Sequence, residues 1–166
     1  MAMKLHDKRR LVGAGLLLLT IVGLLVYQFF WRGSNVVRLP IVEGCALHLQ
    51  PCSSPLPMGG RIVFEINPRQ PAPDEVFHLS ADFEGVEPEA VGARFKGINM
   101  NMGQLEYFVH ELSRRDTLDG SISFAGKGGV FVCSIGVMQW LVIVKLQIEG
   151  RVYELPFEFE TTYLGN

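Results

Sequence analysis

The stretch MQWLVIVKLQI, residues 138–148, is followed by Glu149-Gly150 and then by RVYELPFEFE, residues 151–160. Both runs are rich in β-branched and aromatic residues, and the two residues between them suit a tight turn. From Phe157 onward, phenylalanine and glutamate alternate, which places them on opposite faces of a strand. We therefore predict two strands joined by this turn. Pro156 lacks a backbone donor, which predicts that the second strand lies at an edge of its sheet.

Shorter segments earlier in the chain carry the same strand signals. They are residues 61–66, 75–83, 90–96, 121–125 and 130–133, while residues 105–112 fit either a strand or a helical turn. The glycines at 126, 128 and 129 indicate a hairpin turn. About seven or eight short strands with almost no helical periodicity predict an all-β domain, an immunoglobulin-like β-sandwich over residues 45–166.

The N-terminal part of the chain has a different composition. Residues 11–31 contain no charged side chain, and a helix of that length spans about 30 Å, the thickness of a hydrocarbon core. The basic residues before it are Lys4, Lys8, Arg9 and Arg10. We therefore predict a cytoplasmic segment 1–10, a transmembrane helix 11–31, a linker 32–44 and, in a bacterium, a single-pass inner-membrane protein with a periplasmic domain.

A cleaved signal peptide is the alternative for this segment. Its apolar core is usually shorter than residues 11–31 and is followed by small residues at the cleavage site. The run here ends in bulky side chains at Phe29, Phe30 and Trp31. These features favour an uncleaved anchor in the lipid bilayer.

Two of the three cysteines lie close together, Cys45 and Cys52. In an oxidising compartment such a pair predicts a disulfide. The alternative is a metal site made by Cys45, His48 and Cys52. Their spacing fits none of the short zinc-binding patterns, and no second Cys/His pair completes a tetrahedral set.

Residues 97–103 (GINMNMG) place Met100 and Met102 two positions apart between glycines. In an extended segment both thioethers point to the same face, and soft sulfur ligands select Cu(I). The alternative is that both methionines fill an irregular part of the core. Cys133 is unpaired if Cys45 bonds to Cys52, and its thiolate would complete a Cys/Met site. A buried thiol, or a different disulfide, is the alternative for Cys133.

The methionine turn at 97–103, together with Cys133-x-x-Gly136-x-Met138-x-Trp140, resembles the FixH-like and YtkA-like bacterial proteins. The resemblance covers the apolar N-terminal segment and residues 91–148. It implies a membrane-anchored immunoglobulin-like domain associated with copper handling and with assembly of haem-copper oxidases. Met100 and Met102 match the methionine turn, and Met138 lies on the later strand. The segment from Cys45 to Cys52 is not part of the pattern.

Other residues bear on the candidate site less directly. His110 follows the methionine turn and would supply an imidazole, although a lone histidine at a strand end is more often solvated. Trp140 is expected in the core. The candidate copper ligands are therefore Met100, Met102, Cys133, Met138 and His110.

The bulk composition and the absence of catalytic motifs restrict the function further. The net charge is −2 in 166 residues, so the chain lacks the basic footprint of a nucleic-acid-binding protein. The sequence contains no nucleophile elbow, H-E-x-x-H, phosphate loop or C-x-x-C, and we predict that it is not an enzyme. The alternative to copper delivery is a structural subunit that docks on a larger membrane complex through its helix and a sheet edge.

Overall fold

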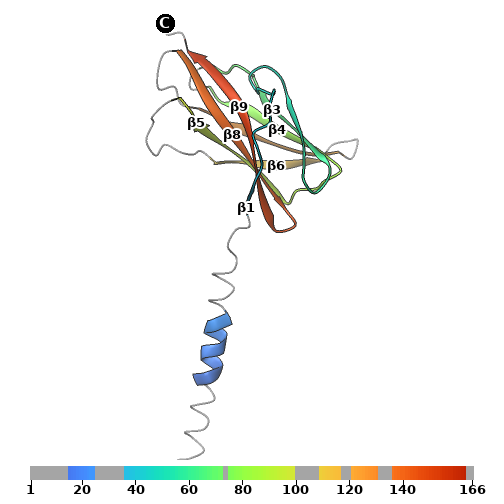
Figure 1. Ribbon diagram of the computed structural model, residues 1–166, viewed down its shortest axis with the longest axis vertical. Helices are drawn as coiled ribbons and strands as arrows, with labels where there is room; N and C mark the ends of the chain where they lie inside the picture. Colours follow the sequence, from blue (N-terminus) through green and yellow to red (C-terminus); the bar gives the residue numbers. More distant parts are fainter. Residues whose placement is uncertain are drawn as a thin grey trace, which may run out of the picture. The chain divides into compact units, whose positions relative to one another are not determined.

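A computed structural model describes residues 15–24, 36–72, 75–99, 109–116, 121–130 and 136–163 (Figure 1). The chain divides into two units, residues 1–35 and 36–166. In the first unit, residues 15–24 form an α-helix with exposed side chains. Across the described residues, none of the helices combines the length and the apolar character needed to span a bilayer. The rest of the predicted transmembrane segment, residues 11–14 and 25–31, lies outside the described residues.

The second unit is all-β, as the sequence predicts. Its strands are β1 (Val36–Arg38), β2 (Cys52–Pro55), β3 (Arg61–Asn67), β4 (Phe77–Glu84), β5 (Ala90–Gly97), β6 (Val109–Asp116), β7 (Ile122–Gly128), β8 (Gly136–Ile148) and β9 (Arg151–Tyr163). They form one sheet in the order β1-β9-β8-β5-β6-β7-β4-β3-β2. β1 lies within the range expected to be a linker, 32–44, and pairs in parallel with β9.

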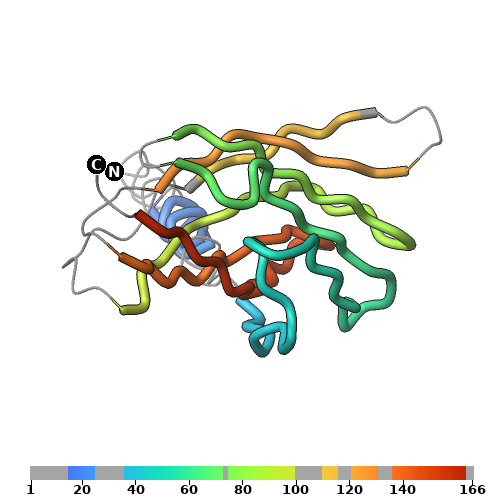
Figure 2. Tube along the Cα trace, turned by 90° about the horizontal axis from the view of Figure 1, so that it is seen from above, coloured from blue at the N-terminus to red at the C-terminus, as the bar shows by residue number. Residues whose placement is uncertain are grey.

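Strand β6 changes its pairing partner along its length. The first half of β6 pairs with β5, where Val91 lies opposite Leu112, and the second half pairs with β7, where Ser113 lies opposite Ala125. The strands on either side of β6 are therefore parts of one curled sheet (Figures 1 and 2). The immunoglobulin-like sandwich that the sequence predicts, with two separate sheets, is not shown.

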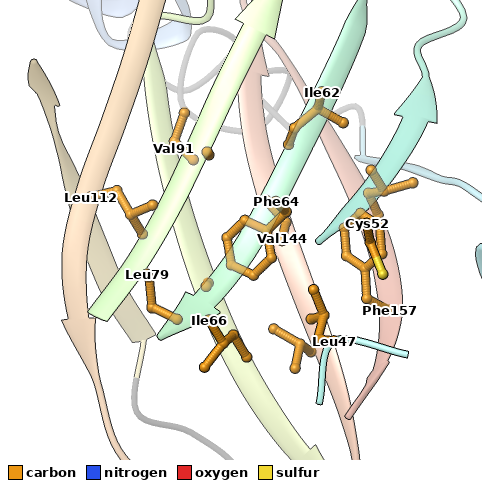
Figure 3. Packing of buried hydrophobic residues seen from close by; sticks show 14 of the residues in the cluster. Leu47, Cys52, Ile62, Phe64, Ile66, Leu79, Val91, Leu112, Val144 and Phe157 are labelled. Atoms are coloured by element: carbon orange, nitrogen blue, oxygen red, sulfur yellow. The ribbon is translucent and has the colours of Figure 1, made fainter. Parts of the chain in front are cut away.

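Aromatic side chains fill the space inside the curl. Phe64 of β3 stacks on Phe157 of β9, with ring centroids 5.8 Å apart, and both rings are fully buried (Figure 3). Phe77 of β4 contacts Phe95 of β5 at 5.4 Å and Phe159 of β9 at 6.0 Å. Burial of a side chain of this size contributes about 1.5–3 kcal/mol. These contacts join strands on the two sides of β6 in the sheet order and hold the curl closed.

The β8–β9 turn confirms the hairpin predicted from residues 138–160, with Ile148 opposite Arg151. The prediction that the second strand is an edge strand is wrong, because β9 lies between β1 and β8. Pro156 is tolerated there because its backbone faces the segment that follows β1. On that side the carbonyl oxygen of Pro156 accepts a hydrogen bond from the N–H of Val42. No N–H of residue 156 is needed on that side.

The turn predicted at glycines 126, 128 and 129 is wrong for the first two, because Gly126 and Gly128 belong to β7 and pair with β4. The strand predicted at 130–133 lies outside the described residues except for Val130. β7 pairs with β4 and β6, whereas β8 pairs with β5 and β9, so residues 129–135 connect different parts of the sheet. Gly128 is required for packing rather than for a turn, because a Cβ there would lie 2.6 Å from the ring of Phe77.

Candidate functional site

The segments that carry the predicted copper ligands leave the sheet at the same end. β5 and β8 are antiparallel, with Gly97 at the end of β5 opposite Trp140 near the start of β8. The connection after β5, residues 98–108, and the connection before β8, residues 129–135, therefore begin or end side by side. We call the described residues around this point the β5/β8 end: Gly97, Ile98, Asn99, Gly136, Val137, Met138 and Gln139.

Asn99 links the two segments directly. Its Nδ2 donates to the carbonyl oxygen of Val137 at 3.0 Å, and its Oδ1 accepts from the backbone N–H of Gln139 at 3.0 Å. The preceding backbone N–H, of Ile98, donates to the carbonyl oxygen of Gln139 at 2.8 Å. The Asn99 side chain thus continues the ladder between β5 and β8 for one more step, and Met100 is the next residue in the chain.

The structure locates two of the five predicted ligands. Met138 is on β8 with no exposed surface, within the hydrophobic core cluster. Its thioether therefore serves as core packing, which is the role that an adaptable apolar side chain fills well. Met100, Met102 and Cys133 lie outside the described residues. Trp140 is buried as predicted, and its Nε1 donates to Oγ1 of Thr161 at 3.0 Å.

His110 is partly buried, not fully solvated as a lone histidine at a strand end would be. Its ring meets the ring of Phe95 edge-on, with centroids 5.8 Å apart. Burial lowers the pKa of His110 below the ordinary value of 6.5, and a hydrogen bond with the backbone of Gly129 opposes part of that shift. The imidazole is therefore neutral at pH 7, which is the form that ligates metals.

The predicted disulfide between Cys45 and Cys52 is present, with Cα atoms 5.7 Å apart. The loop between the two cysteines lies along β9 at Leu47, whose N–H donates to the carbonyl of Glu158, and Cys52 belongs to β2. β1 and β2 are the two end strands of the sheet order. The disulfide therefore closes a short loop, residues 45–52, which we call the corner. Through the corner the chain passes from β1 at one margin of the curled sheet to β2 at the other.

His48 sits on this corner and completes its attachment to β9. Its Nδ1 accepts the backbone N–H of Glu160 at 3.2 Å, and its Nε2 lies 3.7 Å from Oε2 of the same residue. Both cysteine sulfurs are in the disulfide and one nitrogen of His48 is occupied by the backbone. The alternative of a Cys45/His48/Cys52 metal site is therefore wrong.

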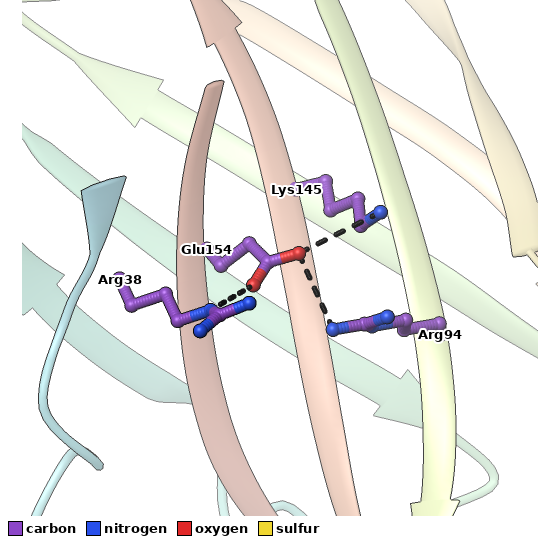
Figure 4. Close-up of polar contacts among 4 residues, drawn as sticks. All are labelled: Arg38, Arg94, Lys145 and Glu154. Atoms are coloured by element: carbon purple, nitrogen blue, oxygen red, sulfur yellow. Dashed lines mark hydrogen bonds and ion pairs between the residues drawn. The ribbon is translucent and has the colours of Figure 1, made fainter. Parts of the chain in front are cut away.

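Sequence reasoning missed a charged cluster on the face of β9 opposite the core (Figure 4). The side chain of Glu154 is only 9% exposed, and its carboxylate lies 3.3 Å from Nε of Arg38, 3.2 Å from an Nη of Arg94 and 3.6 Å from Nζ of Lys145. The β8–β9 turn register already places Lys145 opposite Glu154. Arg38 and Arg94 come from other strands, and no local signal identifies them.

Two further findings bear on the site. Among the described residues, no three or more His, Cys, Asp or Glu side chains are grouped so that they would hold a metal. No family model, curated protein or solved structure matches the chain. The resemblance to FixH-like and YtkA-like proteins therefore stays a prediction.

Proposed function

We propose that this protein is a membrane-anchored accessory protein whose β-domain binds Cu(I) at the β5/β8 end. The observation that carries the proposal is the pair of hydrogen bonds from Asn99 to Val137 and Gln139. Met100 directly follows Asn99, and Cys133 precedes Gly136 by three residues. These bonds support a site in which sulfurs from both connections meet.

The chemistry of such a site is ligand exchange. Met100, Met102 and Cys133 offer two thioethers and a thiolate, a set that suits Cu(I) better than a hard divalent cation. A low-coordinate sulfur site lets an acceptor protein supply the next ligand before the first ones leave. The neutral imidazole of His110 is the fourth candidate, whereas the complete burial of Met138 favours its role in the core.

The location that we propose is the bacterial inner membrane. The uncharged run at residues 11–31 would hold the chain in the bilayer, and the basic residues before it would keep the N-terminus in the cytoplasm. The β-domain would then lie in the periplasm, where a disulfide such as Cys45–Cys52 persists. An immunoglobulin-like domain in this position would deliver copper during assembly of a membrane respiratory oxidase.

A second function is a docking subunit that binds no metal. It is favoured by two exposed apolar side chains at the β5/β8 end, Ile98 at 56% and Val137 at 53% exposure. They flank Asn99 and would contact a partner protein in a membrane complex. In this case Met100 and Met102 would contribute apolar contact area instead of ligands.

A Cu(I) competition titration separates the two functions. The full chain in detergent would compete with a chromophoric Cu(I) chelator under reducing conditions, beside the variants M100L/M102L and C133S. Met58→Leu is the matched control, because Met58 is a described methionine with 38% exposure in the β2–β3 turn.

We expect binding of one Cu(I) per chain, lost in M100L/M102L, weakened in C133S and unchanged in M58L. Equal binding by M100L/M102L and the unsubstituted chain would exclude the methionine turn as a ligand. Absence of binding by the unsubstituted chain would leave the docking function.

A further inference from the structure

A groove separates the two margins of the curled sheet. One wall is the segment after β1, residues 39–42, which follows β9, and the other is the end of β2 with the residues after it, 54–57. The buried side chain of Leu155, on β9, completes the lining, and the volume is about 330 Å³. β1 and β2 are the end strands of the sheet order, so the groove marks where strand pairing does not close the curl.

The lining of the groove is apolar. None of its described residues is charged, and the polar side chain among them, that of Ser54, donates from Oγ to the carbonyl oxygen of Pro55 at 3.3 Å. Ile41 adds an aliphatic side chain at the rim, with 46% exposure. A charged group in the groove would lose hydration without gaining a partner. The groove therefore suits an uncharged, apolar occupant.

Beside the groove, β2 has a free backbone edge. Leu56 donates its N–H to the carbonyl of Gly60, which fixes the alternation of hydrogen bonds between β2 and β3. Every second residue of an antiparallel pair bonds to the partner strand, so Ser54 bonds to β3 and Ser53 directs its N–H and C=O away from it. In the described part of the chain no strand pairs with that edge. The edge can therefore accept one more strand.

The opposite wall has few donors for such a strand. Leu39 and Val42 donate their N–H groups to carbonyls of β9, and Pro40 has no N–H. An added chain would therefore pair with β2. It must supply an acceptor for the N–H of Ser53 and a donor for its carbonyl, because a buried backbone group without a partner is costly. A polypeptide backbone meets this requirement, and a hydrocarbon chain does not.

The volume of the groove limits the shape of the occupant. An α-helix with its side chains is about 10–12 Å across, so about 330 Å³ would hold only about 3–4 Å of its length, less than one turn. A strand occupies about 4.8 by 10 Å in cross-section, so the same volume holds about 7 Å of strand, or roughly two residues. The groove therefore accommodates an extended chain.

We propose that the groove binds an extended, uncharged segment of a partner protein, which adds to the free edge of β2. The partner residue opposite Ser53 exchanges two backbone hydrogen bonds with it. Apolar side chains of the same segment pack against Val42, Leu56 and Leu155. In this mode of recognition the backbone gives affinity and the pocket for side chains gives specificity. No residue of the groove belongs to the β5/β8 end, so the inference does not depend on the copper site.

Peptide selection on the full chain tests the proposal. The chain in detergent would be immobilised and exposed to a phage library of random linear peptides, and fluorescence polarisation would give the dissociation constants of the enriched peptides. We expect these peptides to share adjacent uncharged, apolar residues. Methylation of one peptide nitrogen at a time should weaken binding at every second position, because only alternate N–H groups of an added strand face β2.

Two pairs of variants locate the binding. S53P removes the N–H that points away from β3, whereas the matched control S53A keeps it. We expect S53P to weaken binding by about two- to tenfold, the range for one lost hydrogen bond, and S53A to leave it unchanged. I41E places a carboxylate at the rim and should also weaken binding, whereas V76E, at an exposed valine just before β4, should not. Near-ultraviolet circular dichroism would show which variants keep the fold, and I41E against V76E decides if S53P does not.

Several results would overturn the inference. They are the enrichment of no peptide above a surface without protein, and enriched peptides with charged centres. Equal affinity for I41E and V76E would place the peptides outside the groove. Methylation of the peptide nitrogens without an alternating effect would show apolar binding without strand addition.

Discussion

Replacement of Cys45 and Cys52 by alanine should destabilise the β-domain while leaving its strands in place. The disulfide closes the corner between the two margins of the sheet, and Cys52 is fully buried. Without it, the corner keeps the contacts of Leu47 and His48 with β9. The lost stability therefore has two sources. The unfolded state gains chain entropy, and the folded state no longer buries the sulfur of Cys52.

Its magnitude follows from the loop size. The cysteines are separated by 7 positions, and the chain-entropy relation gives about 2.5 kcal/mol for closing so short a loop. The buried sulfur of Cys52 adds about 0.8 kcal/mol, the value for one buried methylene. We expect a total loss of about 3 kcal/mol. With a urea m-value of about 2 kcal/mol/M, the midpoint should fall by about 1.5 M.

Urea unfolding followed by the fluorescence of buried Trp140 measures this shift. The comparison is C45A/C52A/C133A against C133A, so that Cys133 forms no new disulfide in either protein. A midpoint shift below about 0.3 M would contradict the chain-entropy reasoning. A shift of the expected size that also appears in the C133A protein after reduction would support it, because reduction removes the bond without changing the sequence.

Three further predictions follow from the described contacts. E154Q should lower the free energy of unfolding by about 2 kcal/mol, since it removes the partly buried carboxylate that Arg38, Arg94 and Lys145 share; a loss under about 0.5 kcal/mol in urea unfolding would contradict this. Because the pKa of His110 is lower in the folded chain than in the unfolded chain, the unfolded chain binds more protons at this residue as the pH falls through 6.5, so stability should fall as the pH drops from 7.5 to 5.5, and less so in H110Q. A pH profile identical in both proteins would refute that role. N99A should weaken Cu(I) binding in the competition titration, whereas Q139A, which keeps the backbone contact with Asn99, should not; equal affinities would show that the link between the segments does not position the ligands.

The strands with regular alternation were predictable because each has enough residues to show the period. The segment predicted at 90–96 is β5, Ala90–Gly97, and the two runs that flank Glu149-Gly150 pair as β8 and β9. The disulfide was predictable for a similar reason, since both cysteines are close in sequence. Such features depend on neighbours along the chain.

Features that depend on distant parts of the chain were not predictable. β1 has three residues, too few for a periodic pattern, and its partner β9 lies more than 100 residues away. The same holds for Arg38 and Arg94, which reach Glu154 across sequence separations of 116 and 60. The glycine at position 128 resembles a turn residue in the sequence, but its small size serves the ring of Phe77.

The candidate site was predictable only in part, because some of its features depend on neighbouring residues and others on distant ones. The sulfur residues themselves are visible in the sequence, and Trp140 was correctly expected in the core. The sequence did not indicate that Asn99 bonds to the start of β8, because that contact requires the β5–β8 register. Nor did it separate Met138, which is fully buried, from the other methionines.

The most direct test of the proposed function is X-ray absorption spectroscopy at the copper edge of the Cu(I)-loaded full chain. We predict a low-coordinate shell with at least two sulfur scatterers, and a loss of sulfur scattering in M100L/M102L but not in M58L. A shell of nitrogen and oxygen ligands alone, or an identical spectrum in M100L/M102L, would contradict a copper site at the β5/β8 end.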